Sequence, residues 1–375
     1  GCRNTSVGIY TLYANTTGKH NIAVGYNALR SNTTANHNVA IGECALYSNT
    51  TGSPNVAVGK FALRLNTTGT YNTASGYRTM ITNTTGNYNT ATGTCALGHN
   101  TTGSANDAYG YLTLAGNTTG CCNSAFGDYA LRCNTTGCFN TATGFNALQQ
   151  NTTASHNSGF GMCALKSNTT GTSNTASGFA ALFTNTTGNE NQAFGRDALM
   201  SNTTGCNNVA VGMQALCANT TAGCNVAVGT SALRKTTTGH SNTAIGSYSS
   251  FYTTTGIYNT ASGIQSLYHN TSGCHNSGHG RETLKNNTTG NYNTASGIES
   301  LKSNTTASNN TAVGACALYS NTTGGQNSAF GLLSLISNTT GGDNTGVGYK
   351  SLYLNTTGYS NVAVGYSALC GNTTG

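Results

Sequence analysis

The stretch Asn15–Ser31, NTTGKHNIAVGYNALRS, decides the fold of this chain. The same pattern, N-T-T-G-x-x-N-x-A-x-G-x-x-A-L-x-x, occurs 21 times in full between Asn15 and Gly371 without an insertion or a deletion, and a partial copy stands at each end. We number positions 1–17 from the first Asn of each repeat. Self-similarity at a short fixed period is typical of solenoids and fibrous arrays. The repeat predicts a single continuous solenoid over residues 1–375 with about 22 rungs, where a rung is the coil turn built by one repeat.

Two positions of the repeat never vary, Asn at position 7 and Gly at position 11, while position 9 is mostly Ala and position 15 mostly Leu. Positions 7, 9 and 11 alternate, so in a strand they share one face. We expect that face and the Leu to fill a thin interior, with the Asn amides forming a ladder from rung to rung. The residues of the first two full repeats assigned to this structural ladder are Asn21, Ala23, Gly25, Leu29, Asn38, Ala40, Gly42 and Leu46.

The pattern predicts an all-β protein, specifically a parallel β-solenoid of the β-roll or β-helix type with one 17-residue repeat per turn. Each rung is expected to carry one strand over positions 7–10 and a second over about positions 13–16. Turns are expected at the Gly of position 11 and at N-T-T-G, because Asn and Gly tolerate left-handed backbone conformations. A Gly and a Thr pair in every repeat oppose a helix.

Charge is sparse: 15 Lys and Arg against 8 Asp and Glu, and 6% charged residues in all. Nucleic-acid binding needs a dense stripe of cations with aromatic platforms, so no nucleic-acid partner is expected. No apolar segment is long enough to span a bilayer, so this segment is not expected to enter a membrane. Both ends fall at position 4 of a repeat, which suggests an internal segment of a longer chain, since complete solenoids carry caps.

No catalytic constellation is visible, and we expect no enzyme, cofactor or metal. Glu282 and Glu299 share position 13 in consecutive repeats, but an acid–base pair also needs a pocket, and we expect two solvated carboxylates. His20 and His37 share position 6 in consecutive repeats, and two ligands without a third make a weak metal site.

Fourteen Cys occupy variable positions, and Cys121 and Cys138 share position 5 of consecutive repeats. The rung spacing lies within the range that a disulfide accepts, so this pair is the candidate disulfide. Free thiols and bridges between chains remain alternatives. The N-T-T triplets are also glycosylation sequons, with Asn15, Asn32, Asn49 and Asn66 as the first candidates. The alternative is that N-T-T-G is simply good turn chemistry.

The core N-x-A-x-G stands here as NIAVG (Asn21–Gly25), NVAIG (Asn38–Gly42) and NVAVG (Asn55–Gly59 and Asn208–Gly212). It resembles the head repeat of trimeric autotransporter adhesins, whose cores stack as a parallel β-roll in a homotrimer. The whole repeat is also similar to arrays in bacterial and phage tail-fibre-like proteins that end in a self-cleaving chaperone domain. The resemblance implies a homo-oligomer, with three chains in the first family.

These patterns together predict a non-enzymatic structural fibre or filament shaft, outside a cell, on a cell surface or on a virus particle, that acts as a stiff spacer or adhesin stalk. Its expected partners are copies of itself, as a trimer or filament, and a host surface or glycan. The mildly apolar outward residues at positions 8 and 10 are expected to pack between chains. The main alternative is an ice-binding β-solenoid that uses Thr ladders, and a sugar-degrading β-helix enzyme is a weaker one.

Overall fold

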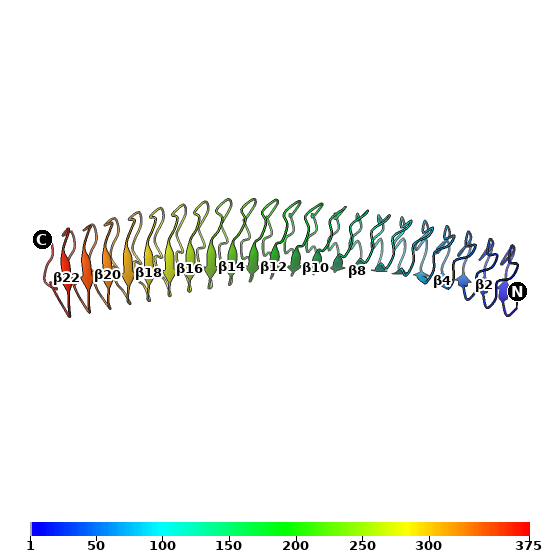
Figure 1. The fold of residues 1–375 in the computed structure, drawn as a ribbon, viewed down its shortest axis with the longest axis horizontal. Coiled ribbons are helices and arrows are strands. Elements are labelled where there is room, and N and C mark those ends of the chain that lie inside the picture. The colour runs from blue at the N-terminus through cyan, green and yellow to red at the C-terminus, as the bar shows by residue number, and fades with distance from the viewer. Residues whose placement is uncertain (1) are drawn as a thin grey trace. The chain divides into compact units, whose positions relative to one another are not determined.

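The computed structural model describes residues 2–375, and it consists of two units, 2–189 and 190–375. Gly1, the first residue of the expected solenoid, lies outside the described residues. In each unit the chain winds as a coil in which every turn carries one short strand (Figure 1). The described residues contain no helix.

The N-terminal unit contains eleven strands. They are β1 (Thr5–Val7), β2 (Ile22–Val24), β3 (Val39–Ile41), β4 (Asn55–Val58), β5 (Asn72–Ser75), β6 (Thr90–Thr92), β7 (Asp107–Tyr109), β8 (Ser124–Phe126), β9 (Thr141–Thr143), β10 (Ser158–Phe160) and β11 (Thr175–Ser177). Each pairs in parallel with the next, and the paired residues are one repeat apart, as Ala23 is from Ala40.

The C-terminal unit repeats this arrangement. Its strands are β12 (Gln192–Phe194), β13 (Val209–Val211), β14 (Val226–Val228), β15 (Thr243–Ile245), β16 (Thr260–Ser262), β17 (Ser277–His279), β18 (Thr294–Ser296), β19 (Thr311–Val313), β20 (Ser328–Phe330), β21 (Thr345–Val347) and β22 (Val362–Val364). They also pair in parallel at a register of one repeat. The predicted parallel β-solenoid with one 17-residue repeat per turn is therefore confirmed.

The predicted second strand over positions 13–16 is wrong, because this part of each rung is a series of tight turns. In the first full repeat Asn27 and Leu29 have φ values of 59° and 50°, so both are left-handed. The Asn27 N–H donates to Ile9 O of the preceding rung, whereas the Leu29 N–H donates to Ala45 O of the following rung. Left-handed backbone costs a non-glycine residue about 1–2 kcal/mol, and here it accompanies hydrogen bonds to both neighbouring rungs.

The interior of a rung is narrow and completely filled. Ala at position 9 and Leu at position 15 have no exposed surface in most rungs, as Ala23 and Leu29 show. The Gly of position 11 must be Gly for two reasons. Gly25 has φ of 123°, and a Cβ built on it would lie 2.8 Å from the carbonyl carbon of Gly42 in the next rung. Any larger residue at this position would force successive rungs apart.

Candidate functional site

The Asn of position 7 joins successive rungs through its whole side chain. Asn21 is fully buried; its Oδ1 accepts the backbone N–H of Asn38 at 3.0 Å and its Nδ2 donates to Ala35 O at 2.9 Å. Many later rungs add an amide-to-amide bond, as from Asn72 Nδ2 to Asn55 Oδ1 at 3.2 Å. The other residues assigned to the ladder lie in the interior too: Asn38, Ala40 and Leu46 are fully buried, and Gly42 sits at the close approach between rungs. These residues fill the interior of the coil and connect successive rungs.

The Asn of position 1 forms a second interior ladder, where the sequence pointed to glycosylation or turn chemistry. Asn32, Asn49 and Asn66 have no exposed surface, and Asn15 is half-buried. The Asn32 Nδ2 donates to Asn15 Oδ1 at 2.9 Å and to Ala35 O at 3.1 Å, so both of its hydrogens are used. A glycan on this nitrogen is incompatible with the folded rung, because the sugar would have to replace one of these hydrogens inside the coil.

The structure brings Cys121 and Cys138 together. Their Sγ atoms lie 2.9 Å apart as thiols, and both residues are half-buried. The hydrogen bond to Cys138, followed by burial, raises the pKa of Cys121 to about 12. The pair is placed for oxidation to a disulfide, which stays a prediction.

His20 and His37 stack with ring centroids 5.0 Å apart and nearly parallel planes. They belong to a broader feature of position 6, whose exposed rings stack on their neighbours in several rungs; His275, for example, lies between Tyr258 and Tyr292. Within residues 2–375 no three His, Cys, Asp or Glu side chains come together as metal ligands.

Glu282 and Glu299 lie in an ion-pair cluster. Lys302 Nζ lies 2.7 Å from Glu282 Oε2 and 3.1 Å from Glu299 Oε1, and Lys285 and Arg281 approach the same two carboxylates at 3.5 Å. The hydrogen bond from Lys302 lowers the pKa of Glu282, and the same bond raises the pKa of Lys302. An acid–base catalyst needs one carboxyl group that holds a proton near neutral pH, so this cluster does not suit that role.

In the single chain the outward residues of position 10 are exposed in most rungs, and those of position 8 are half-buried in most rungs. Ile41 and Val58 at position 10 are 40% and 38% exposed, and Val24 is half-buried. The apolar stripe is interrupted, since Ser75 and Thr92 occupy position 10 of two successive rungs.

The Thr pair of each repeat is divided between two environments. The Thr of position 2 is partly buried, and its hydroxyl donates to the next rung, as from Thr33 Oγ1 to Thr50 O at 3.2 Å. The Thr of position 3 is exposed, as Thr34 and Thr51 show. Position 3 therefore presents one exposed hydroxyl per rung, from Thr or, at Ser272, from Ser, which makes a single file of hydroxyls along the N-T-T-G turn.

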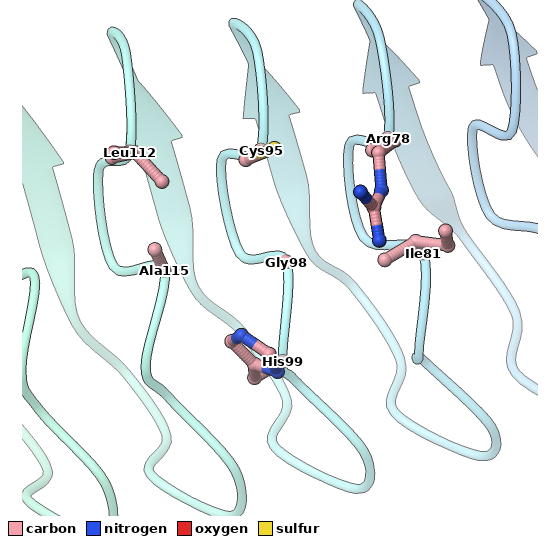
Figure 2. Close-up of a pocket in the computed structure, with 7 residues that line it drawn as sticks. All are labelled: Arg78, Ile81, Cys95, Gly98, His99, Leu112 and Ala115. Atoms are coloured by element: carbon pink, nitrogen blue, oxygen red, sulfur yellow. The ribbon is translucent and has the colours of Figure 1, made fainter.

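A hollow interrupts the surface formed by positions 13, 16 and 17 of the N-terminal unit. We call it the notch; its volume is about 170 Å³, and it is lined by Arg78, Ile81, Cys95, Gly98, His99, Leu112 and Ala115 (Figure 2). It exists because position 16 holds Gly98 and Ala115 in two consecutive rungs, where neighbouring rungs hold Ile81 and Arg132. A second hollow shares His99, Leu112 and Ala115 with the notch and continues to Arg132.

The notch suits binding rather than covalent chemistry. Cys95 and His99 come from the same rung, but Figure 2 shows them at opposite ends of the hollow, so they do not form a thiol–imidazole pair. Its surface is predominantly apolar, from Ile81, Leu112 and Ala115, and the exposed Arg78 guanidinium extends along one side.

Sequence reasoning missed the notch because the hollow results from absent side chains, and only two successive small residues at position 16 signal it. It also missed the second Asn ladder, because N-T-T-G is equally good turn chemistry.

No protein-family model and no curated protein matches this chain. The described residues include no helix with the length and apolar character needed to cross a membrane.

Proposed function

We propose that this chain is a non-enzymatic shaft that holds other parts of a larger assembly apart, on a cell surface, on a virus particle or in an extracellular filament. The observation that carries the proposal is that each rung combines a nearly constant interior with a variable outer surface. Two Asn ladders, Ala, Leu and Gly build the same interior in almost every rung, and the variable side chains lie outside.

This interior suits a mechanical role. Parallel strand pairing, the turn hydrogen bonds and the two Asn ladders all connect one rung to the next, so a rung cannot move without breaking several bonds at once. Each rung touches mainly its neighbours, as in other repeat architectures. The length of such a shaft is set by the number of repeats, at about 4.8 Å for each strand spacing.

Removal of whole repeats tests the spacer role. Deleting residues 66–133, four complete repeats, should leave every junction in register and shorten the maximum dimension by about 19 Å in small-angle X-ray scattering. Deleting residues 66–129 instead removes a number of residues that 17 does not divide, and it should disrupt the coil. A protein that collapses in both cases, or keeps its length after the in-register deletion, contradicts a spacer role.

Location needs a separate measurement. Antibodies can be raised against the surface around exposed position 6 side chains such as Tyr71 and Tyr88. Immunogold labelling of intact cells or particles with these antibodies should mark the outer surface. Labelling that appears only after lysis contradicts the proposed location.

We also propose that the shaft associates with copies of itself through positions 8 and 10. Ile41, Val58 and Phe126 are each about 40% exposed in the single chain, and such apolar side chains along one line of the surface favour contact with a partner. The double substitution Ile41→Lys and Val58→Lys should lower the mass measured by light scattering, whereas Thr34→Lys and Thr51→Lys, at position 3 of the same rungs, should not. A wild-type monomer, or equal masses for both variants, contradicts association by this stripe.

A further inference from the structure

We propose that the surface formed by positions 13 and 16 of the N-terminal unit binds a linear acidic polysaccharide, with one sugar ring seated in the notch and its acid groups on the flanking guanidinium groups. This binding activity goes beyond a spacer role and does not depend on it.

The first observation is the charge of this surface. Positions 13 and 16 of the N-terminal unit carry five cations, Arg30, Arg64, Arg78, Arg132 and Lys166. The carboxylates of residues 2–189 lie elsewhere in the repeat: Glu43 and Asp128 at position 12, and Asp107 at position 8. Glu43 is paired with Lys60 at 2.9 Å, and Asp128 accepts the backbone N–H of Tyr111 at 2.8 Å. The five cations therefore form a surface of one sign without an ion-pair partner among the residues described in this unit.

The second observation is that most of these cations rest on aromatic rings. Arg64 lies 5.4 Å from the centroid of Phe61, Arg132 lies 5.4 Å from that of Tyr129, and Lys166 lies 5.3 Å from that of Phe183. Contacts of this kind restrict long side chains while leaving their charge available. Less conformational entropy is then lost when an anion binds.

The third observation is the notch between two of the cations. Arg78 and Arg132 are three rungs apart, about 14 Å at the usual strand spacing, and both are exposed. The hollows between them are lined by Leu112 and Ala115, with His99 at one end (Figure 2). An apolar depression between fixed polar groups matches a sugar ring, whose C–H faces need apolar contact while its acid groups need cations.

The same features disfavour nucleic acid. Five cations spread over nine rungs are too sparse to follow a backbone that carries a charge at every nucleotide. The notch also offers little for base stacking, because the apolar part of its lining is aliphatic and His99 is the one ring among its lining residues.

Binding to three probes tests the proposal: polygalacturonate, dextran sulfate and neutral dextran, measured by isothermal titration calorimetry at two salt concentrations. Both acidic polymers should bind, more weakly at high salt, and neutral dextran should not. A duplex DNA of matched charge should bind more weakly than either acidic polymer. Tighter binding of the DNA, or equal binding of neutral dextran, overturns the proposal.

Two variants separate the contributions of charge and shape. Arg78→Gln with Arg132→Gln should weaken binding about tenfold, which corresponds to about 0.7 kcal/mol for each exposed contact. The matched control is Arg3→Gln with Lys19→Gln, which changes net charge equally at positions 6 and 5 and should have a much smaller effect. Equal losses in both pairs would mean that only net charge matters and would overturn the assignment to this surface.

Ala115→Ile fills the notch without changing charge. Position 16 already holds Ile81 and Ile336 in other rungs, so the fold accepts this residue, and circular dichroism should show an unchanged spectrum. Affinity for polygalacturonate should fall severalfold. Unchanged affinity would remove the notch from the binding site.

Discussion

Asn219 Oδ1 lacks a hydrogen-bond partner because the next repeat carries Thr236 where almost every other repeat has Asn. The interruption of the ladder extends one rung further, since Thr253 occupies the same position of the next repeat. The buried hydroxyls of Thr236 and Thr253 have no hydrogen-bond partner either. On either side the ladder is continuous, with Asn219 Nδ2 donating to Asn202 Oδ1 at 2.8 Å and Asn287 Nδ2 to Asn270 Oδ1 at 2.9 Å.

Repair of this ladder should stabilise the C-terminal unit. We expect Thr236→Asn with Thr253→Asn to raise the free energy of unfolding by about 1–3 kcal/mol, because a buried unpaired polar group costs about that much. Hydrogen exchange should slow at the amides of these two rungs. Thr238→Asn with Thr255→Asn, at the exposed position 3 of the same rungs, is the matched control and should change little. A repaired protein that is no more stable than this control contradicts the account.

Substitution of a position 11 glycine should open the coil locally. Gly144 has φ of 128°, and a Cβ there would lie 2.7 Å from the carbonyl carbon of Gly161. Gly144→Ala should therefore cost at least about 1–3 kcal/mol from backbone strain alone, seen as faster hydrogen exchange in the two flanking rungs. Gly371→Ala, where a Cβ would meet nothing within 4 Å, should be neutral. Equal effects of the two substitutions would show that close approach of the rungs does not decide this position.

Cys121 should react slowly with alkylating reagents near neutral pH. The hydrogen bond with Cys138 and burial raise its pKa to about 12 from an ordinary value of 9.0, so the protonated thiol predominates, and the thiolate is the nucleophile. Iodoacetamide labelling followed by peptide mass spectrometry should show the rate at Cys121 rising between pH 9 and 12. The stability gained from the thiol pair is complete below pH 9 and is lost as pH rises through 12. The labelling rate of Cys121 in the variant Cys138→Ser is the comparison. If the rate in the wild-type protein reaches half of its maximum near pH 9, the raised pKa is contradicted.

The same two cysteines should form a disulfide when an oxidant is supplied. With oxidised glutathione, one thiolate attacks a glutathione sulfur and the second thiol resolves the mixed disulfide, which releases two reduced glutathiones. Non-reducing peptide mapping should then recover Cys121 linked to Cys138. Recovery of both as separate glutathione adducts would show that the thiols are not held together in solution.

The Glu282 carboxylate should contribute stability that depends on pH. Lys302 lowers its pKa, so its contribution is present above the pKa of an unfolded Glu and is lost as pH falls through the lower folded value. The substitution Lys302→Met should raise the pH at which Glu282 is half-protonated, measured by NMR titration. It should also lower the free energy of unfolding more at pH 7 than at pH 3. A midpoint that does not move would mean that Lys302 does not hold this carboxylate in solution.

Ice binding should be absent. The hydroxyl of the Thr at position 2 donates to the next rung, so the N-T-T-G turns present only the single file of hydroxyls at position 3. Position 5 beside it varies, as Lys19 and Asn36 show. A regular two-dimensional array of hydroxyls is missing. We expect no thermal hysteresis in nanolitre osmometry, and faceted ice crystals would contradict this expectation.

The sequence was sufficient for the period and for the part of the interior formed by positions 7, 9, 11 and 15, because small residues alternate at positions 7, 9 and 11 and a Leu recurs at position 15 in almost every repeat. It was insufficient at positions 13–16, because Leu does not by itself indicate left-handed backbone. Leu29 adopts this conformation together with a hydrogen bond from its N–H to Ala45 O in the next rung, which no local pattern reveals. The burial of Asn32 was hidden for a related reason, since the same N-T-T-G letters suit an exposed turn, a sequon or an interior ladder.

The backbone hydrogen bonds of positions 13 and 15, which run to opposite neighbouring rungs, also determine which groups a rung without a neighbour would expose. The Asn27 N–H donates to the preceding rung and the Leu29 N–H donates to the following one, so a rung that lost either neighbour would be left with unpaired backbone groups on that side. An exposed rung would thus resemble the edge of a sheet across most of its circumference, and such edges recruit further strands. A rung without a neighbour would therefore be able to pair with an added strand on either of its two sides.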